Sequence, residues 1–349
     1  MLFIVATIGS SHSALAQEHV TLQTDFLFYG DNTEFRNPFR EGETILGTAV
    51  RTAAVLGVNE RIRFALGVFG NIRFGDEDAF QLVRPVVALT ISGKRSAFVL
   101  GTLSTPTAGD PPGPDRTGPH GLLPPLQRET LAFDRPYEAG LGWTFQGSTF
   151  RHALWIDWQR LNTPEHRERF DAGAVGEIRL SRLIGLPFQL HIVHEGGQLF
   201  ASGPVADSTA FAAGVRLHGR AGRFDSLSLE VYGLGARFVP DRAEPRRSLD
   251  GAGFFTRASA ERRGWRGHVI VWRGEDFIKD EGDANYLSVR RDGSRYHGTR
   301  DYAETGLSRT FTPAPGVTLE ASGRLHRVEK HYEYSFRILA RALLALTLR

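Results

Sequence analysis

The chain contains no cysteine and only one methionine among its 349 residues. The absence of cysteine excludes disulfide bonds, on which small secreted modules depend. Lysine is also scarce, occurring only at Lys94, Lys279 and Lys330, so arginine supplies almost all of the positive charge. Because 42 basic residues face 39 acidic ones, the net charge is only +3, and no nucleic-acid partner is expected.

The sequence also lacks a long hydrophobic run after its N-terminal segment. Beyond Gln17, no stretch reaches the roughly 18 consecutive apolar residues of a membrane-spanning helix. Residues 2–8 are apolar, and Ala14-Leu15-Ala16 forms an A-x-A cleavage pattern, which together predict a secretory signal peptide over residues 1–16. A buried first strand is the alternative for this segment. Residues 17–349 are expected to form one domain, which can lie in a membrane only as strands.

What the sequence does contain is a recurrent alternation of apolar and polar residues. Such stretches, each about ten residues long, are typical of strands that face lipid on one side and a lumen on the other. We predict sixteen strands, with fourteen and eighteen as alternatives. The predicted spans are 19–29, 43–55, 61–72, 80–92, 95–103, 137–146, 149–161, 170–181, 188–196, 208–218, 224–236, 252–263, 265–273, 301–312, 317–329 and 332–348.

The connections between these strands alternate in length. The even-numbered links, such as 93–94 and 147–148, are tight turns, whereas most odd-numbered links are longer and more polar, above all 104–136 and 274–300. Bacterial outer-membrane barrels have an even number of strands, short periplasmic turns and long external loops. The pattern therefore predicts an all-β fold, a transmembrane antiparallel up-and-down β-barrel with both termini in the periplasm. An array of secreted β-sandwiches is the alternative fold.

In this organisation the chain resembles the Gram-negative outer-membrane β-barrels of the porin-like channel type, over essentially its whole mature length. Residues 30–44 also have the look of a family signature. The resemblance implies a location in the cell outer membrane, contact with its lipid and lipopolysaccharide, and insertion by the barrel-assembly machinery; it leaves the oligomeric state open. Such barrels usually end on an aromatic residue, whereas this chain ends on Leu348-Arg349. A terminal amphipathic helix is therefore the alternative for the last segment.

One face of the predicted strands is strongly charged. In 317–329, for example, Val317, Leu319 and Leu325 oppose Thr318, Glu320, Ser322, Arg324 and His326. The residues predicted to line the pore are Arg63, Arg84, Glu138, Arg151, Asp157, Glu177, Arg179, Glu195, Arg216, Glu230, Arg257, Glu261, Glu304, Glu320, Arg324, Arg337 and Arg341. Because buried charges must be paired or hydrated, such a wall either surrounds water or forms a dense ion-pair network.

A sixteen-stranded barrel is wide enough for an aqueous channel. The predicted function is therefore passive or weakly selective passage of small polar or anionic solutes, including saccharides, although the arginines could equally serve only to neutralise the carboxylates. The proline-rich loop 104–136 either folds inward to constrict the pore or covers it from outside. No cofactor is expected, and the chain is predicted not to be an enzyme.

Two other functions stay open. One is a polysaccharide export conduit of the outer membrane, and the other is an outer-membrane hydrolase that uses Ser294, His297 and Asp301 at the external rim. No metal site is predicted, because strand alternation puts His191 and Glu195 on one face and His194 on the other. The acidic clusters at 76–78 and 275–283 are expected in solvated external loops, with Ca²⁺ binding as the alternative.

Overall fold

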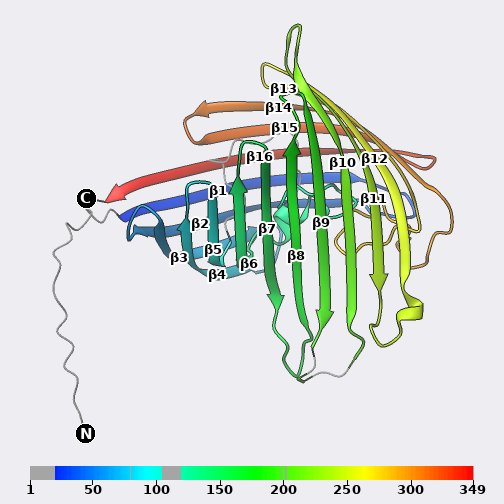
Figure 1. The fold of residues 1–349 in the computed structure, drawn as a ribbon, viewed down its shortest axis with the longest axis horizontal. Helices are drawn as coiled ribbons and strands as arrows, with labels where there is room; N and C mark the ends of the chain where they lie inside the picture. Colours follow the sequence, from blue (N-terminus) through cyan, green and yellow to red (C-terminus); the bar gives the residue numbers. More distant parts are fainter. Residues whose placement is uncertain (1–19, 79, 104–118, 198, 201–202, 349) are drawn as a thin grey trace.

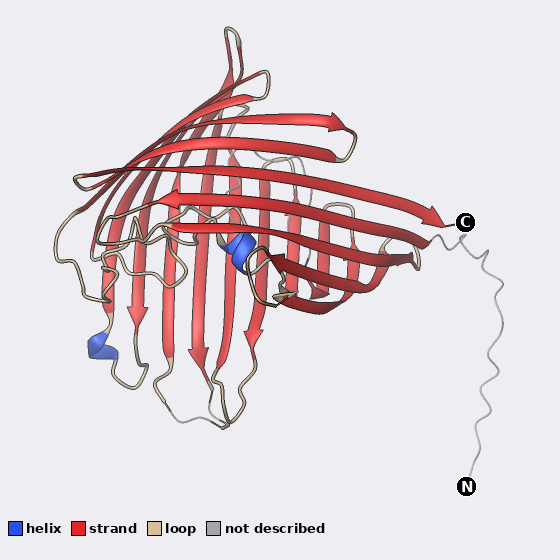
Figure 2. Cartoon of the chain, turned by 180° about the vertical axis from the view of Figure 1, so that it is seen from behind, coloured by secondary structure: helices blue, strands red, loops and turns tan. Residues whose placement is uncertain are grey.

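A computed structural model describes residues 20–78, 80–103, 119–197, 199–200 and 203–348 of the chain. Sixteen strands, each antiparallel to both of its neighbours, form one closed barrel (Figures 1 and 2). The predicted fold class and strand count are thereby confirmed. The segment predicted to be a signal peptide lies outside the described residues and stays a prediction.

The strands and the two short helical segments follow in this order: β1 (Val20–Glu34), β2 (Glu43–Gly57), β3 (Ile62–Arg73), β4 (Leu82–Ser92), β5 (Ser96–Thr102), α1 (Leu131–Asp134), β6 (Ala139–Gln146), β7 (Phe150–Arg160), β8 (Glu168–Arg179), β9 (Ile184–Gly196), β10 (Ala206–Ala221), β11 (Phe224–Val239), η1 (Pro245–Arg247), β12 (Leu249–Arg262), β13 (Trp265–Glu275), β14 (Arg300–Ala314), β15 (Val317–Val328) and β16 (His331–Leu348). Of the helices in the described ranges, none combines the length and the apolar character needed to cross a membrane.

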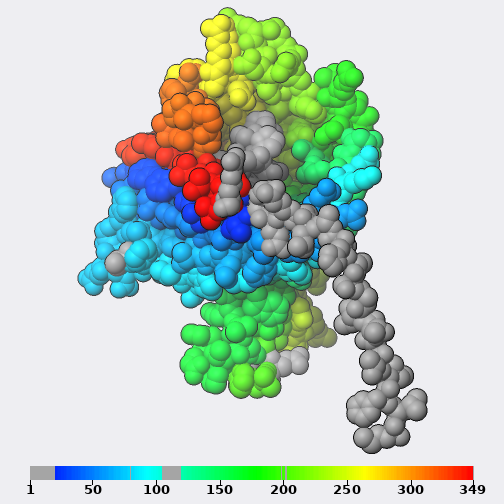
Figure 3. Space-filling view, turned by 90° about the vertical axis from the view of Figure 1, so that its left-hand side faces the viewer, coloured from blue at the N-terminus to red at the C-terminus, as the bar shows by residue number. Residues whose placement is uncertain are grey.

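The barrel closes by pairing its first strand with its last. The register of β1 on β16 runs without a break from Val20 opposite Leu348 to Glu34 opposite Tyr334. Figure 3 shows the blue beginning of β1 beside the red end of β16. The last segment is therefore a strand up to Leu348 and not the amphipathic helix that its arginine spacing also allowed.

Alternation along the strands produces an apolar outer surface. In β3, Leu66 and Val68 are 57% and 50% exposed, whereas Phe69 and Asn71 face the interior and are buried. The same alternation holds in β16, where Tyr334 and Phe336 point outward and Ser335 is buried. An apolar belt around a closed barrel is the surface that a bilayer requires.

Because Leu66 lies near the middle of β3 on this outer surface, a charge there should meet hydrocarbon. We expect Leu66→Arg to lower the free energy of unfolding in lipid by about 2–4 kcal/mol. Equilibrium refolding into phosphatidylcholine vesicles measures this, with Leu66→Ala as the control for lost packing. An arginine variant as stable as the alanine variant would show that this face does not contact lipid.

The connections differ systematically between the two ends of the barrel. One end carries turns of two to four residues, such as 93–95 and 222–223, together with both chain termini. The other end, here called the long-loop rim, carries 35–42, 74–81, 103–138, 161–167, 197–205, 240–248 and 276–299, with only 329–330 short. Several boundaries differ from the prediction. The first strand was predicted to end at residue 29 but continues to Glu34, where it still pairs with β16. Strand β9 begins at Ile184 because Pro187 lies within the strand, opposite Glu177, and not in a turn.

Two of these connections fold into the barrel and fill part of its interior (Figure 2). Leu122, Leu126 and Phe277 are fully buried in one apolar cluster that includes the wall residues Phe255 and Trp272. From the same connection that carries Leu122, Phe133 of α1 stacks on Tyr29 of β1 with ring centroids 5.1 Å apart. Of the predicted loop 104–136, residues 119–136 therefore lie inside, and 104–118 lie outside the described residues. The interior is not lined by charges alone.

The second inward connection corrects a prediction about acidic residues. The cluster at 275–283 was expected to be solvated, yet the side chains of Glu281 and Asp283 are only 6% and 13% exposed. Glu281 pairs with Arg135 and Arg169, and Asp283 pairs with Arg40. These long-range partners hold the segment inside the barrel, whereas the cluster at 76–78 is exposed as expected.

Candidate active site

A serine and a histidine on adjacent strands meet inside the barrel near the long-loop rim. Ser335 is the fifth residue of β16, and His326 is the third residue from the end of β15. In the register of these strands Ser335 lies opposite Arg324, so His326 is its diagonal neighbour on the inner face. Ser335 Oγ lies 2.8 Å from His326 Nε2, and both side chains are buried.

The other ring nitrogen of His326 is held by a tyrosine and a glutamate of β14. His326 Nδ1 lies 2.8 Å from the hydroxyl of Tyr302, which in turn donates to Glu304 Oε2 at 2.6 Å. Since the Tyr302 hydroxyl donates its hydrogen bond to Glu304, the Tyr302 oxygen accepts a hydrogen bond from Nδ1–H of His326. The unprotonated Nε2 is then the acceptor for the Ser335 hydroxyl. This arrangement of nucleophile, base and orienting group is the general requirement for nucleophilic catalysis.

Glu304 and the His326 ring are each held by further contacts. His268 Nε2 lies 2.7 Å from Glu304 Oε1, and Glu304 Oε2 lies 3.4 Å from His326 Nδ1. Phe35 packs edge-on against the His326 ring at 4.9 Å between centroids and an interplanar angle of 89°. These contacts restrict the rotation of the imidazole, as a catalytic base requires.

Two arginines beside the serine are neutralised by the inward connection. Glu129 Oε2 lies 2.8 Å from Arg324 and 2.8 Å from Arg337, and Arg337 also pairs with Asp31 of β1 at 2.5 Å. Burial by itself would raise the pKa of Glu129, but the two guanidinium groups lower it to about 2. Glu129 is therefore an anion at neutral pH and pins residues 119–136 to the wall beside the site.

One cavity lies at this cluster, and a second adjoins it. A cavity of about 30 Å³ is lined by Ser335, His326 and Glu304, together with Thr130, whose buried hydroxyl has no hydrogen-bond partner. Its volume suffices for a water molecule but not for an acyl chain. A second cavity, of about 660 Å³, is lined in part by Arg128, Arg135 and Arg169. Arg40 and Asp283 line both cavities, and they are joined by an ion pair of 2.6 Å.

The residues predicted to line a pore occupy different environments. Among them, Glu138, Asp157, Glu177, Glu230, Arg257 and Glu304 are buried, Arg63, Arg84 and Arg179 are exposed, and Arg151, Glu195, Arg216, Glu261, Glu320, Arg324, Arg337 and Arg341 are half-buried. Several are paired: Glu177 contacts Arg151 and Arg216, and Glu195 contacts Arg160 and Arg169. Whether solute passes along them stays a prediction.

The hydrolase residues expected at the rim do not meet. His297 Nδ1 lies 3.9 Å from Asp276, its side chain is 70% exposed, and Asp301 pairs with Arg273. The cluster around Ser335 was not predicted, although Glu304 and Arg324 were placed on the inner face. The sequence signal that could have located Ser335 is the flanking pair Tyr334 and Phe336, because the residue between two outward-facing side chains of a strand must point inward.

The whole chain is similar to known outer-membrane proteins in two ways. A family model described as Lipid A 3'-O-deacylase-type matches residues 11–343. Among solved structures, a loop L8 deletion mutant of OmpT from Vibrio cholerae has a TM-score of 0.56 at 10% identity and covers 94% of this chain and 99% of its own. OccAB1 from Acinetobacter baumannii gives 0.52 at 9%, covering 96% and 98%. No curated protein sequence matches the chain.

These similarities have different weight. An anion-selective porin from Comamonas acidovorans is also similar, with a TM-score of 0.53 at 10% identity. At such low identity, the solved structures support only the fold of an outer-membrane barrel. The family model carries an activity in its description, and it spans nearly the whole chain. The prediction that the chain is not an enzyme is therefore wrong, because the family that it matches is an enzyme family.

Proposed function

The chain belongs to the lipid A 3'-O-deacylase-type family, and we propose that it hydrolyses an O-acyl ester of a lipid A-like glycolipid with Ser335 as the nucleophile. The observation that carries this proposal is the contact of 2.8 Å between Ser335 Oγ and His326 Nε2. An ester hydrolase needs an activated nucleophile, and the hydrogen-bonded set Ser335, His326, Tyr302 and Glu304 supplies one.

The reaction follows from the positions of these groups. His326 Nε2 takes the proton as Ser335 Oγ attacks the ester carbonyl carbon, and the tetrahedral intermediate then breaks its bond to the sugar oxygen, which receives the proton from His326. Water, activated by the same histidine, releases the fatty acid from Ser335. The Thr130 hydroxyl, which has no other hydrogen-bond partner among the described residues, lines the same cavity and is the donor available to the oxyanion.

The position of the cluster along the barrel agrees with this substrate. We assign the long-loop rim to the cell exterior and the chain termini to the periplasm, as is usual for such barrels. Ser335 then lies at the level of the outer leaflet, which contains lipopolysaccharide. The 660 Å³ cavity is lined by four arginines and four carboxylates, and each of its arginines is paired with a carboxylate, so a phosphorylated headgroup would have to displace a carboxylate to bind there. Since Arg40 and Asp283 separate this cavity from Ser335, their ion pair must open to admit the ester.

Transport has weaker support than hydrolysis. The structural neighbours contribute only the fold to the channel hypothesis, and the apolar cluster around Leu122 and Phe277 occupies part of the interior through which solutes would pass. The polysaccharide conduit meets the same obstacle. The expected partners, namely the assembly machinery and small solutes, are likewise supported only by the fold.

The direct test is incubation of the refolded protein with purified lipopolysaccharide in detergent. We expect mass spectrometry of the lipid A portion to show the loss of one ester-linked acyl chain, with the free fatty acid appearing in equal amount. Recovery of unchanged lipid A at every enzyme concentration, from protein whose migration is heat-modifiable, would refute the hydrolase proposal.

Tyr302 has a smaller expected effect because it positions His326 without touching the substrate. In Tyr302→Phe, the Nδ1–H of His326 can still reach Glu304, but across 3.4 Å. We expect kcat to fall about 10–100-fold with little change in KM. Tyr137→Phe is the matched control, since its hydroxyl bonds to Pro85 O on the wall between β4 and β6. A fall in KM or an unchanged kcat would remove Tyr302 from the positioning role.

A further inference from the structure

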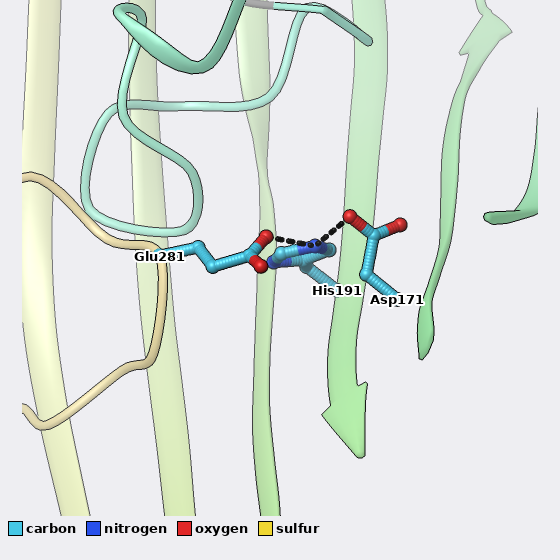
Figure 4. A group of neighbouring side chains, drawn as sticks. All are labelled: Asp171, His191 and Glu281. Carbon is cyan, nitrogen blue, oxygen red and sulfur yellow. Dashed lines mark ion pairs between the residues drawn. The ribbon is translucent and has the colours of Figure 1, made fainter. Parts of the chain in front are cut away.

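A second polar cluster lies inside the barrel, apart from the serine site. Asp171 and His191 come from the adjacent strands β8 and β9, and Glu281 comes from the inward connection 276–299. Figure 4 shows the two carboxylates on either side of the imidazole. One ligand atom from each residue lies within 4.8 Å of the others, and no other such group of three occurs among the residues that the structure describes.

The contacts of His191 leave one nitrogen aimed into this group without a partner. The ring is fully buried, and Nδ1 lies 3.1 Å from the carbonyl oxygen of Leu126, so Nδ1 carries the proton and donates it. Nε2 is then a lone-pair donor, but it makes no hydrogen bond. It lies 3.7 Å from Asp171 Oδ2 and 3.8 Å from Glu281 Oε2, which is too far for direct bonds. A metal-bound histidine typically has its other ring nitrogen bonded to a backbone carbonyl.

The carboxylates are held in a matching way. Both Arg135 and Arg169 bind Glu281 Oε1, at 2.5 and 3.1 Å, so that Oε2 points to the histidine without a hydrogen-bond partner. The indole of Trp155 donates to Asp171 Oδ1 at 3.0 Å, and Gln159 donates to Oδ2 at 3.2 Å. Glu281 is thus held through the oxygen that faces away from His191. Asp171 is held at both oxygens, and its Oδ2, which faces His191, keeps a second lone pair for an ion beside the hydrogen bond from Gln159.

The backbone of β8 also makes room for the cluster. Gly173 lies opposite Trp155 on β7 and opposite His191 on β9. A Cβ atom at Gly173 would lie 2.2 Å from Trp155 Cζ2, so the indole can lie flat over this strand only because the residue is glycine. The glycine thus allows Trp155 to reach Asp171 beside His191.

From this geometry we propose that Asp171, His191 and Glu281 bind one divalent transition-metal ion of the zinc type. Zinc takes one histidine nitrogen and two carboxylate oxygens at about 2.0–2.2 Å, which in a tetrahedron places the ligand atoms about 3.4 Å apart. The two distances from His191 Nε2 need to shorten by only a few tenths of an ångström to reach this arrangement. The two carboxylate oxygens, which lie within 4.8 Å of each other, need to approach by up to about 1.4 Å, which rotation of the Glu281 side chain can supply. The fourth position falls to a water molecule. The ion joins the inward connection 276–299 to the wall, independently of the ester chemistry.

Positive groups nearby do not prevent binding. Arg135 and Arg169 are each directed to the oxygen of Glu281 that faces away from the site. Lys279 donates to the carbonyl oxygen of Asp280 at 2.7 Å, so its ammonium group is directed to the backbone of its own segment.

The test uses the full chain without a polyhistidine tag, refolded in detergent, stripped with a chelator and titrated with ZnCl₂ in a calorimeter. We expect one ion per chain, and Co²⁺ in place of Zn²⁺ should give the visible absorption bands of a tetrahedral site. Glu281→Gln and His191→Ala should each lower the affinity by more than about 100-fold. His166→Ala, which removes an exposed histidine of the β7–β8 connection, is the matched control and should bind as the wild type does.

Three results would overturn the proposal. They are the absence of stoichiometric binding by the wild type, binding that survives in both Glu281→Gln and His191→Ala, and saturation by Ca²⁺ or Mg²⁺ under conditions where Zn²⁺ does not bind. Glu281→Gln keeps the size of the side chain and lies in a connection, so its folding can be verified by heat-modifiable migration if His191→Ala does not fold. Because no ester substrate is present, the outcome does not depend on the hydrolase proposal.

Discussion

Replacement of Ser335 by alanine should abolish ester hydrolysis while leaving the barrel intact. Among the residues that the structure describes, the serine supplies the only oxygen hydrogen-bonded to His326 Nε2, so its loss leaves the base without a nucleophile to activate. In such hydrogen-bonded sets, removal of the nucleophile alone typically lowers kcat about as much as removal of all members together. We therefore expect kcat to fall by at least about 10³-fold. The measurement is release of fatty acid from lipopolysaccharide by refolded protein.

The control for this variant is Ser228→Ala. Ser228 is also a buried barrel serine, and its hydroxyl bonds to Ser259 at 3.1 Å on the neighbouring strand β12. It should retain wild-type activity and heat-modifiable migration. If Ser335→Ala hydrolyses lipopolysaccharide at a rate near that of Ser228→Ala, the nucleophile must be another group, such as a water molecule activated by His326.

Acidification should release the inward connection 119–136 from the wall. Burial opposes the ionisation of Glu129, but Arg324 and Arg337 lower its pKa from 4.5 to about 2. A depressed pKa adds stability at pH values above the unfolded value of 4.5, and this stability is lost as the pH falls towards 2. The shift corresponds to about 3 kcal/mol.

Amide hydrogen exchange within 119–136 measures this effect. After correction for the intrinsic rate, we expect protection to fall about 100-fold between pH 5 and pH 2. Glu129→Gln leaves both arginines without their anion, so its protection should be low at pH 5 and nearly independent of pH. A wild-type profile as flat as that of Glu129→Gln would show that the ion pairs do not anchor the segment.

The strands were predictable because each one carries its own signal. In β15, for example, Leu325 points outward and His326 points inward, because successive side chains of a strand alternate between its two faces and one face meets lipid. The boundary error in β9 has a local cause as well, since Pro187 is usually a turn residue but lies here within a paired strand.

The inward connections were not predictable in the same way. Leu122 is buried because Phe255 and Trp272 of distant strands enclose it, and no spacing within 104–136 encodes that contact. The candidate active site has the same character. Its members Glu304, His326 and Ser335 come from three strands, and only barrel register brings them together, whereas the predicted set around His297 was chosen for closeness in sequence.

The seam between β1 and β16 has a consequence for biogenesis. Asp31 of β1 lies opposite Arg337 of β16, and their ion pair across the seam contacts the same carboxylate of Glu129 that borders Ser335. Until the two ends of the chain have joined, these groups are on separate edges, and the cavity beside Ser335 lacks the wall that β1 and the following residues supply. Under the proposed function, we therefore expect a nascent chain in transit through the periplasm to be inactive and hydrolysis to begin only after insertion is complete.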